Sequence, residues 1–434
     1  MSAPVRWTGP LSALGPEALR TLLSRGQVDS GERELPAKVA ALLAEVRTRG
    51  DAALRDLARR FDQVILASLE VPREAVRAAL ERQPPALRRA MERSARNVAR
   101  VHAAFRPQAS WVEVEPGVVV ERRPDPLDRV GVYAPGGRAS YPSSVLMGAV
   151  PARVAGVREV ILCSPPGPDG RPSDAVLAAA AVAEVDRVFA LGGAGAIAAL
   201  AYGTESVPAV DRIVGPGNVW VAEAKLQISS RVPIDSPAGP SELLVLLDAT
   251  SDIEAVAREL LAQAEHDPDA AVVAVALDDR SARRLLERVA ALVPTAARAD
   301  VIRPALSGRG AVLVASSLDE AVAFAERWAP EHLMVAVEGA SELARRLRNA
   351  GTVFVGTSSS GAFGDYLTGA NHVLPTAGAA RAWSGLSTLD FMRWTTVQTV
   401  SRQGAASLSA DTDLFATAEG LQAHAAAARA WRAP

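Results

Sequence analysis

The sequence predicts an α/β fold in which two Rossmann-like domains with parallel sheets carry helical extensions at both ends of the chain. From residue 128 onward, short apolar runs alternate with longer stretches at helical spacing, and this pattern is typical of parallel strands covered by helices on both faces. The glycine- and proline-rich segment 236–241 breaks the series near its middle, which favours two sheets over one. The two alternating blocks could be two copies of one nucleotide-binding unit.

The front of the chain is predicted to be helical and to serve packing. A short helix is expected over 16–24, a longer one over 35–61, and helical spacing continues over 73–105 with a break near Pro84. His102 in the last of these has no acidic or histidine neighbour. We therefore expect His102 to be structural.

Nine apolar runs after residue 128 are the strand candidates. They are 130–134, 160–163, 187–191, 212–214, 243–247, 272–277, 311–314, 332–337 and 352–355. Between them, helical spacing is clearest over 173–185, 218–231, 280–293 and 318–328. Beyond residue 381 the alternation fades, and a terminal helix is expected over 413–431.

The composition predicts a soluble protein with two or more domains. The chain has 434 residues, 49% of them hydrophobic, and a net charge of -2, which argues against binding of nucleic acid. Residues 1–10 lack the apolar run of a signal peptide, and no apolar run approaches the roughly 20 residues of a membrane span. We therefore expect a cytoplasmic protein. The single cysteine, Cys163, is expected in the core.

Three glycine-rich turns follow predicted strands of the first block. They are Gly131–Gly137, which leads to Tyr141-Pro-Ser-Ser144, then 191–198, and Gly215–Asn218. Each alone is weak, since the first is equally well a plain tight turn and the second matches G-x-G-x-x-A only from Gly193. Because carboxyl ends of parallel strands meet at one edge of a sheet, the three together favour a nucleotide cleft, with Asp211 as a candidate ribose partner.

Polar side chains gather at the end of a predicted helix in the second block. Apolar residues recur at three- and four-residue steps from Ile253, after a start at Ser251 or Asp252, and Asp267-Pro268 ends the helix. Gln263 and His266 then share its last turn and could bind one metal ion. The simpler alternative is that His266 only complements the negative end of the helix dipole.

Four of the five histidines have acidic or amide neighbours in the sequence. The histidines are His266, His332, His372 and His424, and their neighbours are Gln263, Glu265, Glu331, Asp365 and Glu419. Any one of them alone is most simply a satisfied core residue, but four of them favour a common site. A zinc ion with nitrogen and oxygen ligands and open positions for substrate fits such a set.

Glu331 and His332 adjoin at a predicted helix-to-strand junction. An imidazole could take a proton from an alcohol, and a carboxylate could activate water. Adjacent side chains on a strand point to opposite faces, so both reach one site only if the junction is bent.

Eight motifs, taken together and in order, resemble the L-histidinol dehydrogenase family, which uses zinc in the last two steps of histidine biosynthesis. They are Tyr133-Ala-Pro-Gly-Gly137, Gly215-Pro-Gly-Asn218, Pro237-Ala-Gly-Pro-Ser-Glu242, Gln263-Ala-Glu-His266, Pro330-Glu-His-Leu333, Gly364-Asp-Tyr366, Asn371-His-Val-Leu-Pro375 and Glu419-Gly-Leu-Gln-Ala-His424. The resemblance runs from about Leu35 to His424.

The resemblance implies a role for each matching residue. Zinc would be held by Gln263, His266, Asp365 and His424. Glu331 and His332 would be catalytic, and Tyr133 and Asn218 would contact NAD. The expected substrate-binding residues are Ser241, Gln263, His266, His332, Asp365, His372, Glu419 and His424. The resemblance also implies a homodimer in which the tail bearing Glu419 and His424 completes the partner's site.

One position departs from the family pattern. The family usually has glutamine, associated with the cofactor, where this chain has Gly195. Loss of one hydrogen bond costs on the order of 1 kcal/mol, which would weaken NAD binding without abolishing it.

With the resemblance, the chain divides into four parts. The N-terminal helical extension is 1–28, and a larger α/β domain with the zinc site combines 29–132 with 241–386. A Rossmann-like NAD-binding domain spans 133–240, and residues 387–434 form a C-terminal tail swapped between the subunits of the dimer.

The implied reaction is oxidation of L-histidinol to L-histidine through L-histidinal with two NAD. Three alternatives stay open. A related enzyme could oxidise another small polar alcohol such as a sulfonated diol, a zinc hydrolase could use Glu331 on water without a cofactor, and a catalytically silent zinc-stabilised dimer would bind metal but neither NAD nor histidinol.

Overall fold

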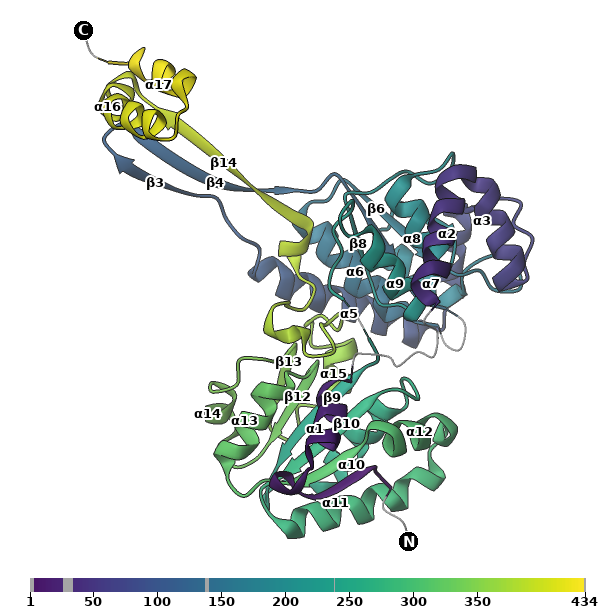
Figure 1. The fold of residues 1–434 in the computed structure, drawn as a ribbon. Coiled ribbons are helices and arrows are strands. Elements are labelled where there is room, and N and C mark those ends of the chain that lie inside the picture. The colour runs from purple at the N-terminus through teal and green to yellow at the C-terminus, as the bar shows by residue number, and fades with distance from the viewer. Residues whose placement is uncertain (1–3, 26–33, 137–139, 238, 433–434) are drawn as a thin grey trace.

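Two α/β domains and a long antiparallel ribbon make up the structure, a computed structural model (Figure 1). The ribbon projects from the first domain and ends in a small helical tail. The predicted fold class is therefore confirmed. The residues described are 4–25, 34–136, 140–237 and 239–432. Parts of the expected N-terminal extension (1–3 and 26–28), and Gly137 and Ala238 of the expected motifs, lie outside them.

The first sheet has five strands in the order β2-β7-β6-β5-β8. They are β2 (Glu70–Val71), β5 (Arg129–Tyr133), β6 (Glu159–Ser164), β7 (Arg187–Ala190) and β8 (Arg212–Val214). The last four are parallel, and their order is that of half a Rossmann fold, with the topological switch point between β5 and β8. The helices between and after them are α6 (Pro142–Ala155), α7 (Asp174–Val182), α8 (Gly193–Tyr202) and α9 (Val219–Ile228).

The second sheet has six parallel strands in the order β1-β11-β10-β9-β12-β13. They are β1 (Trp7–Pro10), β9 (Glu242–Leu247), β10 (Ala271–Ala276), β11 (Ala311–Val314), β12 (His332–Ala336) and β13 (Thr352–Val355). From β9 to β12 the order repeats that of the first sheet, so two copies of one topology are present. The second switch point lies between β9 and β12.

Helices cover both faces of the second sheet, and each face has its own apolar core. The helices of this domain are α1 (Pro16–Leu23), α10 (Ile253–Ala264), α11 (Asp279–Leu292), α12 (Ala299–Arg309), α13 (Leu318–Trp328), α14 (Ala340–Ala344) and α15 (Gly361–Tyr366). Strand β1 was not predicted, because Trp7-Thr-Gly-Pro10 is short and contains two residues that are poor strand formers. Such residues are tolerated here at the edge of the sheet.

The predicted domain boundaries are wrong for residues 34–132, the described part of the segment 29–132. This segment was expected in the larger domain with 241–386, but its buried apolar side chains, apart from Val118 in the ribbon, share one core with the five-stranded sheet. Its helices are α2 (Leu35–Arg49), α3 (Asp51–Leu57), α4 (Arg73–Arg82) and α5 (Pro85–Ala104). An apolar stripe shows that a helix packs, but it does not specify the sheet that it covers.

The ribbon was missed, and the helical tail was predicted only in part. Strands β3 (Ser110–Glu115), β4 (Val118–Pro126) and β14 (Met392–Val400) pair antiparallel. Much of the ribbon is solvent-exposed, so the sequence lacks a strong alternation of apolar and polar residues. The terminal helix expected over 413–431 is instead two helices, α16 (Arg402–Ala418) and α17 (Gln422–Arg429), because Gly420 turns the chain with a φ of 76°.

Cys163 is fully buried in β6, as expected. His102 is buried in α5, and burial lowers the pKa of its imidazole, which agrees with a packing role. Within the described residues, no helix is long and apolar enough to cross a membrane. The cytoplasmic location stays a prediction.

Candidate active site

The three predicted glycine turns meet at the carboxyl edge of the first sheet. Tyr133 ends β5, and its buried hydroxyl accepts a hydrogen bond from the Gly193 amide that follows β7, at 3.1 Å. Gly215, after β8, has a φ of +115°, and a Cβ there would lie 2.1 Å from the Tyr133 carbonyl oxygen. Only glycine therefore lets the two turns approach. This edge lies at the switch point between β5 and β8, where ligands of such sheets bind.

Asn218 begins α9 as its N-cap. Its side-chain oxygen accepts hydrogen bonds from the amides of Trp220 and Val221, both at 3.1 Å. The residue remains exposed, so its amide group is available beside the Tyr133 turn. Asp211, in contrast, precedes β8 and accepts a hydrogen bond from the Arg129 amide at 2.9 Å. Asp211 thus lies at the opposite edge of the sheet, and its assignment as a ribose partner was wrong.

Gly195 occupies a buried position in α8, facing α3. A Cβ at this position would lie 2.9 Å from the end of the Leu57 side chain and 3.6 Å from that of Leu54. The space beside the helix is thus filled by leucines of α3. A longer side chain here would require Leu57 to shift, which gives a packing reason for the departure at Gly195.

A buried ion pair holds the Gly215 turn from behind. Lys225 of α9 pairs with Asp235, and both side chains are 4% exposed. The Lys225 ammonium also donates to the Gly215 carbonyl at 2.9 Å, and the Gly215 amide donates to Asp235 at 2.7 Å. The pair therefore fixes both the amide and the carbonyl of Gly215 at the switch point.

Replacing Lys225 with methionine is expected to destabilise the protein and weaken dinucleotide binding. Removing one partner of a buried pair leaves an uncompensated charge and costs about 3–5 kcal/mol. Thermal unfolding should shift by on the order of 10 °C, and calorimetry should show weaker binding of NAD. Lys38→Met is the matched control, because Lys38 forms an exposed pair with Glu34 of little worth. Equal behaviour of the two variants would contradict the role of Lys225.

Glu331 and His332 lie at the amino end of the second sheet, at its switch point. Glu331 accepts a hydrogen bond from the Glu242 amide at 2.7 Å, and the His332 Nδ1 lies 2.9 Å from the Glu242 carbonyl oxygen and 3.4 Å from Glu331 Oε2. Ala329, just before them, has a left-handed φ of 47°. The junction is therefore bent, and both side chains are buried together.

The hydrogen bond at Nδ1 fixes the tautomer of His332. A carbonyl oxygen can only accept, so Nδ1 must carry a proton. In the neutral ring, Nε2 is then the proton acceptor, and it lies 3.8 Å from Asp365. Burial disfavours the charged imidazolium, but the carboxylates of Glu331 and Asp365 outweigh it and raise the pKa of His332 to about 9.

Gln263, His266 and Asp365 come from the ends of two neighbouring helices. Helix α10 begins at Asp252, whose side chain caps Ala255, as predicted. The Gly361 amide at the start of α15 donates to Glu259 of α10 at 2.9 Å. Gln263 follows Glu259 by one turn on the same helix face, and Asp365 lies one turn after Gly361. His266 lies two residues beyond the end of α10 and is exposed.

The segment after α15 ties this site to the first domain. Asn97 of α5 donates to the Leu367 carbonyl at 2.7 Å, and Asn371 donates to the Met147 carbonyl of α6 at 2.8 Å. His372 is held by the Asp365 carbonyl oxygen, 2.9 Å from its Nδ1, which leaves its Nε2 available. The segment therefore places Asp365 and His372 where the two domains meet.

The tail residues do not join this group within one chain. Glu419 follows α16 and His424 lies in α17, both exposed, at the far end of the ribbon (Figure 1). In the part of the chain that the structure describes, no three His, Cys, Asp or Glu side chains are arranged to hold a metal ion. The four predicted zinc ligands thus do not converge in a single subunit.

Two residues of this region were missed from the sequence. Glu242 was quoted within a motif but given no role, and Arg25 was not considered. The signal available for Glu242 was a carboxylate that directly precedes the apolar run 243–247. Nothing in the local sequence distinguishes Arg25 from the many other arginines.

Sequence and structural comparisons agree on one family. A family model described as histidinol dehydrogenase matches residues 25–432. The chain is 45% identical over 420 residues to a histidinol dehydrogenase of Methanosarcina barkeri, which covers 96% of each chain. It is 46% identical over 397 residues to that of Burkholderia pseudomallei, which covers 90% of this chain and 89% of the relative.

The same family appears among solved structures. The crystal structure of histidinol dehydrogenase from Elizabethkingia anophelis matches with a TM-score of 0.93 at 31% identity. The match covers 99% of this chain and 98% of the other. The motifs at the two switch points therefore sit in a shared fold, and the chain belongs to the histidinol dehydrogenase family.

Proposed function

We propose that this protein oxidises L-histidinol to L-histidine through L-histidinal, with two NAD molecules used in sequence. The observation that carries the proposal is the Glu331-His332 pair, which is buried at the amino end of the second sheet where the two domains meet. The glycine turns around Tyr133 and Asn218 supply a dinucleotide site of the kind that a hydride acceptor needs. Family membership supports the choice of histidinol.

His332 acts as the base of the first oxidation. This step needs the neutral ring, so it is favoured as the pH rises toward the His332 pKa of about 9. In the neutral ring, Nε2 accepts the hydroxyl proton of the alcohol as hydride leaves the carbon that bears the hydroxyl group for the nicotinamide. The Nδ1 proton on the Glu242 carbonyl keeps the ring in the required tautomer. His372, fixed by the Asp365 carbonyl, presents its Nε2 to the substrate.

Glu331 acts as the base of the second oxidation. Its Oε2 is held by the Glu242 amide, and its carboxylate takes a proton from water as the water attacks the aldehyde. The resulting hydrate transfers its hydride to the second NAD and releases a proton, which leaves the carboxylate of histidine. The two bases are adjacent in sequence, so the substrate carbon need not move far between steps.

The donor set fits a zinc ion shared between subunits. Gln263, His266 and Asp365 of one subunit, with His424 of a second copy, offer the nitrogen and oxygen atoms that zinc prefers. A half-buried carboxylate next to His332 is where an ion could orient a substrate without blocking the base. When bound, zinc would hold the imidazole and amine of the substrate and so act as a template.

We also propose that the ribbon and tail form the interface of a homodimer. Large apolar side chains are exposed on them, including Trp111 at 71%, Leu414 at 69% and Phe415 at 73%. Monomers rarely expose such patches. In the dimer, the tail would bring Glu419 and His424 to the partner's site.

The proposal is tested by counting NADH formed per L-histidinol before and after chelation. We expect two NADH per substrate, loss of turnover after chelation, and recovery when zinc is returned. Absence of NADH with histidinol would overturn the proposal. NADH with another small polar alcohol only, together with failure to support a histidine auxotroph on histidinol, would favour the related alcohol dehydrogenase, and hydrolysis without NAD would favour the hydrolase.

A further inference from the structure

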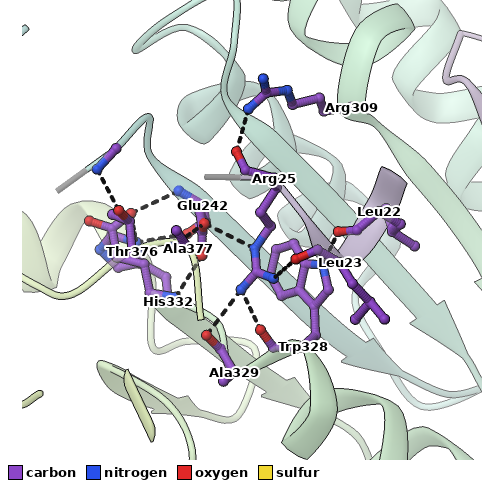
Figure 2. Close-up of polar contacts among 12 residues, drawn as sticks. Leu22, Leu23, Arg25, Glu242, Arg309, Trp328, Ala329, His332, Thr376 and Ala377 are labelled. Carbon is purple, nitrogen blue, oxygen red and sulfur yellow. Dashed lines mark hydrogen bonds and ion pairs between the residues drawn. The ribbon is translucent and has the colours of Figure 1, made fainter. Parts of the chain in front are cut away.

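Arg25 is a buried arginine whose guanidinium faces Glu242, close to His332 of the proposed catalytic pair (Figure 2). Its Nε lies 2.9 Å from Glu242 Oε1, and both side chains are 2% exposed. This N–H is poorly aligned with the oxygen, so the contact is an ion pair without a good hydrogen bond. The guanidinium also stacks on the Trp328 ring, 3.8 Å from its centroid.

The other end of the guanidinium holds the turn that precedes Glu331. Its Nη2 donates to the Ala329 carbonyl at 3.0 Å and to the Trp328 carbonyl. These are orphan carbonyls at the end of α13, which a cation can cap. Ala329 has a left-handed φ of 47°, a conformation that an alanine adopts only under strain. Arg25 therefore stabilises the bend that brings Glu331 and His332 to one site.

Glu242 connects Arg25 to both catalytic side chains. Its carboxylate accepts hydrogen bonds from the Ala377 amide at 2.7 Å and the Glu331 amide at 3.3 Å. Its own amide donates to Glu331 at 2.7 Å, and its backbone carbonyl accepts a hydrogen bond from His332 Nδ1. Ala377 has a left-handed φ of 59°, so a second strained backbone residue depends on the same carboxylate.

The positive charge of Arg25 favours the ionised form of the Glu242 carboxylate, which accepts these hydrogen bonds. Burial raises the pKa of Glu242, and the positive charge of Arg25 opposes that shift. Without the arginine, Glu242 would be a buried, unpaired acid next to Glu331. It would take up a proton or move, and either change releases the amides that it holds.

We propose that Arg25 is a positioning residue for Glu331 and His332, which acts through Glu242 and through the turn at Ala329. The inference rests on the proposed function of the catalytic pair. Arg25 itself touches no reacting atom. Two nearby contacts do not involve the guanidinium of Arg25. The Leu22 carbonyl of α1 accepts from the Trp328 indole at 2.9 Å, and Arg309 donates only to the backbone carbonyl of Arg25, at 2.5 Å.

Two substitutions at Arg25 test the proposal, with Arg309 as the matched control. Arg25→Met should lower kcat by about 100-fold, the loss expected from a displacement of about 1 Å, with KM for histidinol and NAD and the zinc content little changed. Arg25→Lys should recover part of kcat. Lysine keeps a positive charge opposite the Glu242 carboxylate, but it lacks the guanidinium group that donates to the two carbonyls. Arg309→Met removes an anchor of the same segment and should lower Tm but leave kcat unchanged.

A second readout does not depend on turnover. With only five histidines, the ring nitrogens of ¹⁵N-labelled protein can be assigned with the help of His332→Asn. The proton on His332 Nδ1 should give a hydrogen-bonded signal in the wild-type and Arg309→Met proteins and lose it in Arg25→Met. If wild-type protein forms no NADH from histidinol, the proposed function fails and the spectrum alone still decides the role of Arg25. Unchanged kcat and an unchanged His332 signal in folded Arg25→Met or Arg25→Lys protein would overturn it.

Discussion

Replacing Glu331 with glutamine is expected to halt the reaction after the first hydride transfer, so that one NADH forms per histidinol in place of two. Glutamine has the shape of glutamate and can still accept the Glu242 amide that holds Glu331 at 2.7 Å. It cannot take a proton from water. Loss of a general base costs about 100- to 10,000-fold, and this loss should fall on aldehyde oxidation. Single-turnover measurement of NADH, with trapping of the aldehyde, reads the effect directly.

His332→Ala should affect mainly the first oxidation step and Glu331→Gln mainly the second, so the two variants are compared. Removing the base for the alcohol proton should slow oxidation of histidinol more than oxidation of added histidinal. Glu338→Gln is the neutral control, because Glu338 is exposed just beyond the same strand. If Glu331→Gln yields two NADH, or if the preferences of the two variants are exchanged, the roles of Glu331 and His332 are reversed.

The alternation of apolar runs and helices was sufficient to predict the sheets, because parallel strands buried on both faces need continuous apolar residues. All nine predicted runs coincide with strands, with shifts of at most one residue at their ends. The order of strands could not be read, since it depends on which strands pair across long separations. That order places the amino end of β12 next to that of β9, which is why Glu242 meets Glu331 and His332.

Short sequence motifs predicted features that depend on neighbouring residues, but they could not predict contacts between residues far apart in the sequence. The start of α10 at Asp252 followed from its capping side chain, and the glycine turns followed from positions such as Gly215, where only glycine fits. Asp211 was misplaced because its distance along the chain does not say at which end of β8 it lies. Arg25 reaches Glu242 across more than two hundred residues, and no spacing rule links such a pair.

Activity is expected to depend on two subunits, and heterodimers can show this. Gln263, His266 and Asp365 belong to the body of the chain, whereas Glu419 and His424 lie at the end of the ribbon (Figure 1). His266→Ala and His424→Ala should each retain about 1% of activity or less. Loss of a residue that only hydrogen-bonds to a metal ligand costs about 10- to 100-fold, and loss of the ligand itself should cost more. A heterodimer of the two variants combines one intact body with one intact tail. Isolated through two different tags, it should show about half of wild-type activity, because one of its two equivalent sites is complete.

The matched control places both substitutions on one chain and pairs that chain with wild type. This heterodimer carries the same two changes, but each of its sites now has one altered ligand, so it should be nearly inactive. If the tail instead completed the site of its own chain, the two results would exchange, and the double variant paired with wild type would keep half of the activity. The pair of measurements therefore separates a shared site from a self-contained one, whatever the effect of either substitution on stability, because both heterodimers contain the same altered residues. Restored activity in the first heterodimer alone would place His424 in the site of the partner subunit.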